Sequence, residues 1–255
     1  MLRTRIIPII QLNNRELVKT VNFKNPKYLG DPLNAIKIFN EKRVDELIII
    51  DLSTAKKRGD IDFEFIEELC SECFMPIGYG GGIKSLKDIE KLFKIGVEKI
   101  IINSLFIENP EIIKQAIEKF GSQSIVISID LKSTFFSKIK TPHIHSGKTK
   151  VPLSTKEYLS RCVQMNVGEI LINDIDREGT FKGYDLAILK SFGEKINIPL
   201  IINGGVSNLN DFIQGKNSEF DAFAAGSFFC LQKPHLAVLI TYLNQDEILQ
   251  INQIK

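Results

Sequence analysis

The stretch MPIGYGGGI, at residues 75–83, decides the fold of this chain of 255 residues. It is a short apolar run that leads directly into three glycines, as a strand does when it ends in a tight turn. Glycines in such a turn let backbone N–H groups approach a bound anion closely. A similar stretch, IPLIINGGV at residues 198–206, follows 123 residues later, counted from Pro76 to Pro199. The chain therefore presents the same kind of strand end twice.

The shift of 123 residues also relates other residues of the chain. It carries Gly81 onto Gly204, Gly82 onto Gly205, Glu46 onto Glu169, Asp51 onto Asp174, and Asn103-Ser104 onto Gly226-Ser227. All of these residues stand at the starts or ends of apolar runs. We therefore interpret the chain as an internal duplication of two half-barrels, about residues 1–123 and 124–246, each with one anion-binding strand end.

Eight apolar, β-branched runs alternate with amphipathic segments along the chain. The runs lie at residues 5–10, 47–51, 76–80, 99–103, 125–130, 169–174, 199–203 and 222–226. They are apolar on both faces, as parallel strands covered by helices are. Helices are expected at residues 31–42, 63–74, 85–94, 110–120, 154–165, 185–195, 209–215 and 234–244. This order predicts an α/β fold, a single-domain (β/α)8 TIM barrel over residues 1–255, rather than an open doubly wound sheet. Long loops are expected at residues 12–30 and 131–152.

The composition excludes several classes of function. Apolar residues make up 44% of the chain, charged residues 25%, and the net charge is +2, which indicates a globular protein that binds neither nucleic acid nor an acidic membrane surface. No apolar run reaches the ~18 residues of a membrane helix, and no signal peptide is visible. Cys70 and Cys73 form a single C-x-x-C without a matching pair or histidines, so we expect reduced thiols in the cytoplasm, no metal site and no cofactor.

In a barrel of this type, chemistry takes place at the C-terminal ends of the strands, here called the mouth. Two groups of residues there can each form an anion cradle from backbone N–H groups and a hydroxyl. The first cradle is Gly81, Gly82, Asn103 and Ser104, and the second cradle is Gly204, Gly205, Gly226 and Ser227. Two cradles on opposite sides of one mouth predict a long substrate with a phosphate at each end, whereas the alternative is that these glycines only make tight turns.

Three side chains near the mouth are candidates for other roles. Asp130 ends the apolar run SIVISID, so its carboxylate is expected to point into the mouth as a general acid or base, the alternative being an ionised loop cap. Asp51 is a second candidate of this kind. Lys19 lies in the first long loop, where it can close over a phosphate or simply be solvated.

Charged residues also stand at the opposite end of the predicted strands. Arg5, Glu46, Lys99 and Glu169 lie at or just before the starts of the first, second, fourth and sixth runs. They can close a ring at the bottom of the barrel, here called the charged ring. Because that face of a barrel usually serves stability, the residues alone favour a stabilising ion-pair cluster.

The chain resembles the HisF family, the cyclase subunit of imidazole glycerol phosphate synthase. The resemblance runs from end to end through RIIPII, VKTVNF, GDP, VDELIIIDL, GYGGGIKS, GVEKIIINS, NPE, FGSQSIVISID, GEILINDIDREGT, GYDL and NGGV. It implies a duplicated half-barrel with two phosphate sites, to which it adds Gly179, and a HisH-like glutaminase as partner. Ammonia would enter the barrel bottom through the charged ring, which matches the family's gate, and travel to a bisphosphate substrate at the mouth. Glu98 falls where the family has an acidic residue at the glutaminase interface.

The chain departs from this family at the mouth. Asp130 matches the second catalytic aspartate, but Gln11 replaces the first, and an amide cannot exchange a proton near pH 7. The remaining departures are Glu178 for an aspartate, Asn173-Asp174 for Thr-Ser, Val151-Pro152 for Thr-Gly and Asn14-Arg15 for Asp-Gly. This pattern is more similar to the glycosyl amidation-associated, WbuZ-type branch, in which the barrel and its glutaminase supply ammonia to a sugar amidotransferase for bacterial surface polysaccharides.

Four hypotheses follow. The first is an ammonia-conducting barrel subunit for sugar amidation, and the second is a histidine-pathway cyclase that tolerates Gln11. The third is a non-catalytic scaffold that activates the glutaminase. The fourth is an isomerase barrel of histidine synthesis, which the charged ring disfavours because that enzyme has no gate and no glutaminase.

Overall fold

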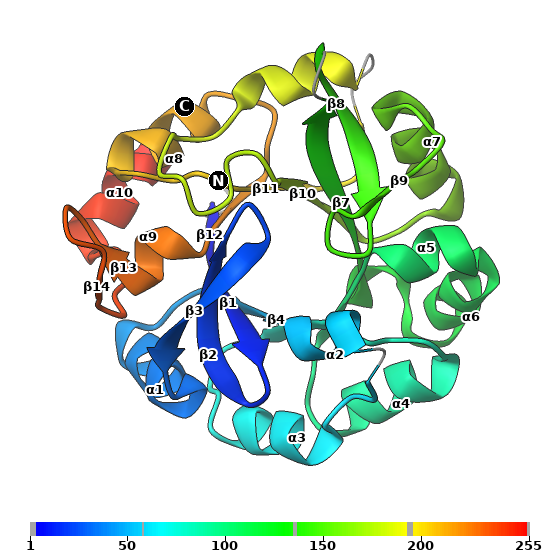
Figure 1. Cartoon of the computed structure of the whole chain (residues 1–255), viewed down its shortest axis with the longest axis horizontal. Helices are drawn as coiled ribbons and strands as arrows, with labels where there is room; N and C mark the ends of the chain where they lie inside the picture. Colours follow the sequence, from blue (N-terminus) through cyan, green and yellow to red (C-terminus); the bar gives the residue numbers. More distant parts are fainter. Residues whose placement is uncertain (1–3, 58, 135–136, 193–195, 254–255) are drawn as a thin grey trace.

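The computed structural model describes residues 4–57, 59–134, 137–192 and 196–253. Among these residues, parallel strands close into a barrel, surrounded by an outer ring of helices (Figure 1). The eight barrel strands are β1 (Arg5–Asn13), β4 (Leu47–Asp51), β5 (Ile77–Gly80), β6 (Lys99–Ile102), β7 (Ile125–Thr134), β10 (Glu169–Asp174), β11 (Leu200–Asn203) and β12 (Ala222–Ala225). Pairing runs in chain order, and the pairs β7–β10 and β12–β1 complete the ring. The predicted single-domain (β/α)8 barrel is confirmed.

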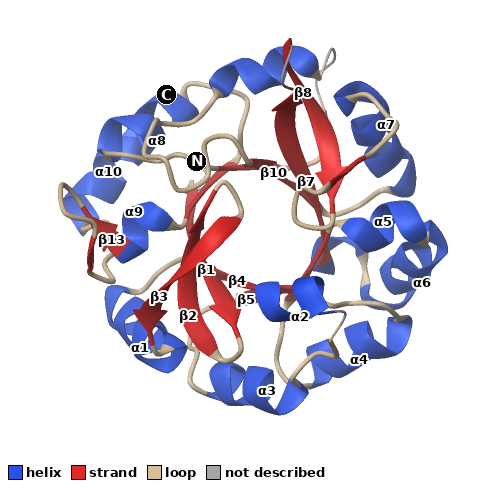
Figure 2. Cartoon of the chain, in the orientation of Figure 1, coloured by secondary structure: helices blue, strands red, loops and turns tan. Residues whose placement is uncertain are grey.

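Helices cover the outside of the barrel (Figure 2). They are α1 (Pro32–Lys42), α2 (Leu52–Lys57), α3 (Phe63–Ser71), α4 (Leu86–Lys94), α5 (Ser104–Glu108), α6 (Pro110–Phe120), α7 (Thr155–Met165), α8 (Leu209–Lys216), α9 (Ser227–Cys230), α10 (Gln245–Gln253), and the 3-10 segments η1 (Ser122–Ser124) and η2 (Leu186–Ser191). Polar side chains begin several of them: Asp31 accepts from Leu33 N before α1, and Ser154 forms a capping box with Glu157 before α7. No helix in the described part of the chain is long and apolar enough to cross a bilayer.

One predicted helix is wrong and another differs. Residues 234–244 form no helix but contain β14 (Ala237–Val238), which pairs with β13 (Leu231–Gln232). The helix begins later, where Asn244 and Glu247 satisfy each other's backbone N–H groups, and this capping signal determines its start. The segment at 185–195 is a 3-10 helix over Leu186–Ser191, and residues 193–195 lie outside the described residues.

The two expected loops are largely β-hairpins. β1 runs on to Asn13 and folds back into β2 (Glu16–Val21), which pairs with β3 (Lys24–Gly30). β7 likewise extends beyond Asp130 and pairs with β8 (Ser137–Ile144), which continues into β9 (Thr149–Lys150). Both hairpins rise from the C-terminal ends of their barrel strands, so they wall the mouth (Figure 1).

Two apolar clusters fill the fold. The larger one lies between the barrel and its helices. The smaller one fills the barrel interior and consists of Ile7, Ile9, Ile48, Ile101, Val126, Leu171, Ile201, Ala222 and Ala224. Gly78 belongs to this interior, because a Cβ there would lie 3.2 Å from Ile101 Cδ1 and 3.3 Å from Ile48 Cγ1. The barrel axis is therefore lined by apolar side chains, several of them small.

The glycine turns repeat in conformation between the two halves. Gly81 has a φ of +126° and Gly204 one of +117°, values that favour glycine. A Cβ at Gly81 would lie 2.4 Å from Asp51 O, and one at Gly204 would lie 2.8 Å from Asp174 O. Each turn thus approaches the backbone at the end of a neighbouring strand, as the internal repeat predicts.

The helices that follow these turns repeat as well. Before α4, Ser85 forms a capping box with Asp88, and before α8, Asn208 forms one with Asp211. These residues are related by the same shift of 123 positions. The boundaries of the two half-barrels, near residues 123 and 246, stay a prediction.

Candidate functional site

The mouth encloses a cavity of about 840 Å³ that reaches from the interior isoleucines to the hairpins. Its lining includes Gln11, Asp51, Gly81, Gly82, Asn103, Ser104 and Asp130. The structure thus brings the first cradle and the predicted acid–base residues together around one space. The cavity is large enough for a ligand of several functional groups.

Asp130 is buried at the end of the inner face of β7. Its Oδ1 accepts hydrogen bonds from Asn173 Nδ2 at 2.9 Å and from Ser128 Oγ at 3.2 Å, and Asn203 Nδ2 donates to Asn173 Oδ1 at 2.7 Å. Burial raises the pKa of Asp130 to about 6, against the opposing effect of these two donors. A carboxyl group that changes protonation near neutral pH suits general acid–base chemistry.

Gln11 occupies the corresponding position on β1. It pairs with Ile50 in the same register in which Asp130 pairs with Asn173, and residue 173 is residue 50 shifted by 123. Gln11 Oε1 accepts from the backbone N–H of Thr20 at 2.9 Å, which fixes the orientation of the amide. Gln11 therefore holds the first hairpin in place, and its amide cannot act as a general acid or base.

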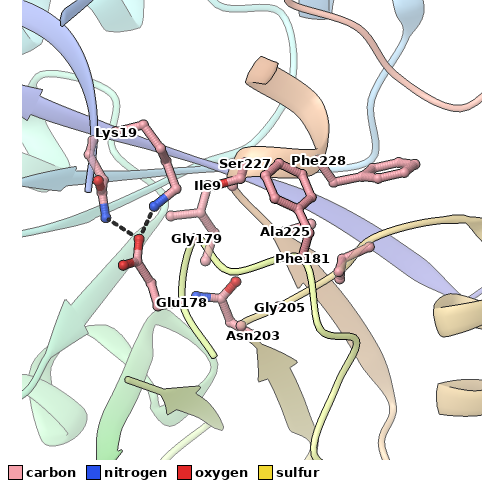
Figure 3. Close-up of a pocket in the computed structure, with 14 residues that line it drawn as sticks. Ile9, Lys19, Glu178, Gly179, Phe181, Asn203, Gly205, Ala225, Ser227 and Phe228 are labelled. Atoms are coloured by element: carbon pink, nitrogen blue, oxygen red, sulfur yellow. Dashed lines mark hydrogen bonds and ion pairs between the residues drawn. The ribbon is translucent and has the colours of Figure 1, made fainter. Parts of the chain in front are cut away.

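Glu178 forms a buried contact with Lys19 (Figure 3). Glu178 Oε1 lies 3.4 Å from Gln11 Nε2 and 2.9 Å from Thr20 Oγ1, and its Oε2 accepts from Phe23 N at 3.0 Å. Lys19 Nζ pairs with this carboxylate and donates to Thr20 O. Glu178 thereby ties the end of β2 and the turn between β2 and β3 to the turn after β10.

Lys19 is buried rather than solvated, with 6% of its side chain exposed. Burial lowers the pKa of its ammonium to about 7, against the opposing effect of the nearby Cys230. Its stem lies over the second cradle, because a Cβ at Gly226 would be 3.0 Å from Lys19 Cε.

The second cradle surrounds a small cavity of about 20 Å³ (Figure 3). Lys19, Gly179, Gly204, Gly205, Gly226 and Ser227 all line it. Gly205 has a φ of +96°, and a Cβ there would lie 2.4 Å from Gly183 O, so only glycine fits. Ser227 Oγ is buried and has no hydrogen-bond partner among the residues that the structure describes. An unsatisfied hydroxyl among backbone N–H groups and a lysine is suited to an anion.

The first cradle is open to the large cavity. Asn103 uses its amide to reach Ser128 O at 3.0 Å and His143 O at 3.3 Å, so this side chain holds neighbouring strands in place. Ser104 begins α5, and its hydroxyl accepts from the backbone N–H of His145 at 3.1 Å. The turn between β8 and β9 therefore lies directly against this cradle.

The charged ring is closed at the bottom of the barrel. Arg5 contacts Glu46 Oε2 at 2.8 Å and Glu169 Oε1 at 3.0 Å, and Lys99 contacts the same two carboxylates at 2.8 and 3.2 Å. Glu46 is buried, and no described residue forms a hydrogen bond with its Oε1. Each cation thus bridges both carboxylates below the apolar interior.

A third set of charges anchors the second hairpin. Lys140 of β8 contacts Asp174, and its Nζ lies 3.3 Å from Asp185 and 3.7 Å from Asp176. Burial raises the pKa of Asp174, and Lys140 opposes this. This cluster fixes the hairpin to the segment after β10.

Other predicted features lie away from the mouth. Glu98 is exposed, just before β6 at the bottom of the barrel. Cys70, Cys73, Cys162 and Cys230 are free thiols. Burial raises the pKa of Cys70 to about 12 and that of Cys73 to about 11. Within the residues described, no group of three or more His, Cys, Asp or Glu side chains could hold a metal ion.

Sequence reasoning missed Thr20 and His145 as residues of the mouth, gave Glu178 no role there, and placed Asn173 at a strand end without a contact to Asp130. Thr20 and His145 lie in the two segments that the sequence predicts as loops. Those segments contain no continuous apolar run like the runs of the barrel strands, so they gave no strand signal. The hairpin pairing, by contrast, places Val18 opposite Gln11 and His143 opposite Asp130.

Comparison with known proteins extends over nearly the whole chain. The model of the family described as histidine biosynthesis protein matches residues 5–234. A protein of Leptospira interrogans, provisionally named imidazole glycerol phosphate synthase subunit HisF, is 42% identical over 250 residues, which cover 97% of this chain and 98% of that protein. A Pseudomonas aeruginosa protein, provisionally named subunit hisF2 of the same synthase, is 43% identical over 243 residues, covering 95% and 96%. Imidazole glycerol phosphate synthase subunit HisF of Lactococcus lactis is 35% identical over 230 residues, covering 90% and 89%.

Proposed function

Because the chain belongs to the HisF family of histidine biosynthesis proteins, we propose that it is the ammonia-receiving barrel subunit of a glutamine amidotransferase. In this role a HisH-like glutaminase binds the bottom of the barrel, near the exposed Glu98. Ammonia released there enters through the charged ring and leaves at the mouth. The complex would work in the cytoplasm, where glutamine and reduced thiols are found.

The observation that carries this proposal is the order of features along the barrel axis. The charged ring lies at the N-terminal strand ends, the apolar interior follows it, and the cavity of about 840 Å³ lies at the other end. Neutral ammonia can cross an apolar passage, whereas the desolvation of ammonium costs several kcal/mol. Because no described residue forms a hydrogen bond with Glu46 Oε1, this oxygen can accept one from an N–H group of the entering ammonia.

The residues at the mouth support delivery of ammonia over ring closure. Gln11 cannot act as acid or base, and the carboxylate beside it, Glu178, is engaged with Lys19, Thr20 and Phe23 N. Loss of one proton-transfer group typically costs about 10²–10⁴ in rate. We therefore propose that the ammonia serves a separate sugar amidotransferase, which modifies a sugar of a bacterial surface polysaccharide.

The test uses the chain together with its co-encoded glutaminase. We expect the two proteins to elute as one complex in size-exclusion chromatography. Gly78→Leu should narrow the barrel next to Ile48 and Ile101, retain the complex, and abolish glutamine-dependent amidation of the polysaccharide, as measured by mass spectrometry. Ammonium salt in the medium should restore the product. Absence of a complex contradicts the proposal, and full activity of the narrowed barrel would instead favour a non-catalytic scaffold.

A second candidate is the cyclase of histidine biosynthesis. It is favoured by Asp130, whose burial brings its pKa to about 6, and by two anion cradles at one mouth. The test supplies ammonium salt and phosphoribulosyl-formimino-aminoimidazole bisphosphate to the wild type and to Gln11→Asp, beside complementation of a histidine auxotroph. Robust turnover by the wild type would assign the histidine reaction. We expect none, and turnover by Gln11→Asp alone would show that Asp130 and the cradles retain working geometry.

A further inference from the structure

His145 is a residue of the mouth for which neither proposed reaction has a role. It lies at the tip of the turn between β8 and β9 and lines the large cavity together with Ser104 and Glu108. His145 Nε2 is 3.0 Å from Glu108 Oε1, and its Nδ1 is 3.4 Å from Ser104 Oγ. The imidazole thus stands between a carboxylate and the hydroxyl of the first cradle.

The turn that carries His145 is held in place by its surroundings. His145, Ser146 and Gly147 all have φ values near +55° to +74°, and a Cβ at Gly147 would lie 2.7 Å from Ile175 Cδ1. Ser104 Oγ accepts from the backbone N–H of His145 at 3.1 Å. These contacts fix the backbone from which the ring extends toward the cradle, while 46% of the side chain remains exposed.

The contacts of the ring determine what protonation changes. An ionised carboxylate only accepts, so the nitrogen that faces Glu108 carries hydrogen. In the neutral ring, Nδ1 is then an acceptor for the Ser104 hydroxyl. In the protonated ring, Nδ1 becomes a donor, and the hydroxyl hydrogen is released. Protonation therefore turns Nδ1 into a donor for an anion at the cradle, while the Ser104 hydroxyl can donate to Asn103 Oδ1 at 3.3 Å or to the same anion.

We propose that His145 is an anion-binding residue of the first cradle, which takes the phosphoryl group of the ligand in its dianionic form and exchanges the contact with Glu108 for it. The proposal rests on the second candidate function, the cyclase, since it names a residue that would hold one phosphate of the bisphosphate substrate at this mouth. The other charged groups around this cavity are Lys148 beside the ring, Lys84 beyond the glycine turn, and Asp51 and Asp130 at the strand ends. The two lysines favour an anion throughout the neutral range, and the two carboxylates oppose it.

The test uses sulfate as probe, because sulfate keeps its double charge while phosphate itself titrates. Binding to the full-length protein is followed by NMR through the backbone amides of Gly82 and Ser104, and separately through those of Gly205 and Ser227. In the wild type, we expect the affinity at the first pair to be about 10-fold lower at about pH 8 than at about pH 5.5. Glu108→Gln, which removes the competing carboxylate, should strengthen this binding at about pH 6.

The decisive variant is His145→Gln, with His235→Gln on the exposed β13–β14 turn as its matched control. His145→Gln should remove the pH dependence of sulfate binding at Gly82 and Ser104. It should leave sulfate binding at the second cradle, over which Lys19 lies, unchanged. His235→Gln should behave as the wild type at both. A pH dependence that survives His145→Gln overturns this inference alone. Absence of any sulfate response at Gly82 and Ser104 in the wild type overturns both the inference and the first phosphate site of the cyclase candidate, whereas the ammonia-conducting role is tested separately by Gly78→Leu.

Discussion

Gln11 Nε2 lies 3.4 Å from Glu178 Oε1, so an amide faces a carboxylate at the place where a second carboxylate would meet repulsion. The amide is bound on its other side by Thr20 N, and both residues are buried. Gln11 and Glu178 are therefore compatible as a pair. A change at one of them is expected to depend on the other.

The first prediction concerns Gln11→Asp. It places two carboxyl groups close together, which raises the pKa of one of them. The folded state then binds more protons than the unfolded chain between about pH 4 and pH 7, so its stability falls as the pH rises through that range. We expect a loss of about 1 to 3 kcal/mol at neutral pH and little loss at about pH 4, measured by urea unfolding. Gln11→Asp combined with Glu178→Gln should recover most of the loss, and an equal loss in the single and double variants would contradict this account.

The second prediction concerns Asp130. Burial raises the pKa of its carboxyl to about 6, above the usual value near 3.9 in an unfolded chain. The wild type therefore loses stability as the pH rises from about 4 to above 6. Asp130→Asn avoids this loss and keeps an acceptor for Asn173. We expect the variant to be more stable by about 2 to 3 kcal/mol at about pH 7.5 and equal to the wild type at about pH 4. If the difference in unfolding free energy between Asp130→Asn and the wild type is the same at both pH values, the carboxyl of Asp130 does not have a raised pKa in the folded state.

These two predictions show how far the sequence reaches. The eight barrel strands follow from continuous apolar, β-branched runs, and Asp130 ends one of them, so both its position and its direction could be predicted. The contact between Lys19 and Glu178 could not, because it joins two segments whose distance depends on how the first hairpin folds. β3, with the sequence KNPKYLG, has lysines, a proline and a mostly exposed surface, and it carries no alternation that would mark a strand.

The third prediction concerns the charged ring. Lys99→Met removes one of the two cations that bridge Glu46 and Glu169 and leaves Arg5 alone with both carboxylates. One negative charge of the two carboxylates is then left without a matching cation. Because Glu46 is only 2% exposed, water solvates this excess charge poorly. We expect a loss of about 2 to 3 kcal/mol in the free energy of unfolding. Lys119→Met, which removes the exposed partner of Glu90, serves as the control and should leave the unfolding curve unchanged.

The fourth prediction separates the second cradle from the first. Gly205→Ala forces an alanine into a φ of +96° and against Gly183 O, so the turn must shift. We expect a loss of more than about 1 kcal/mol in stability and loss of sulfate binding at Ser227, while Gly82 and Ser104 still respond. Gly59→Ala is the matched control, because the nearest atom to a new Cβ there is 4.0 Å away. Retained sulfate binding at Ser227 in Gly205→Ala would mean that the glycine turn does not form the cradle.

The repeat of 123 residues gives this chain an internal record of its own divergence. The two glycine turns and the capping boxes that follow them keep the same backbone form, yet the residues that point from equivalent positions into the mouth are Gln11 in one half and Asp130 in the other. The effect of an amide at one position and a carboxyl group at the other can therefore be compared within a single molecule. At the mouth the difference between Gln11 and Asp130 lies in the side chain, on strands that pair with their neighbours in the same register.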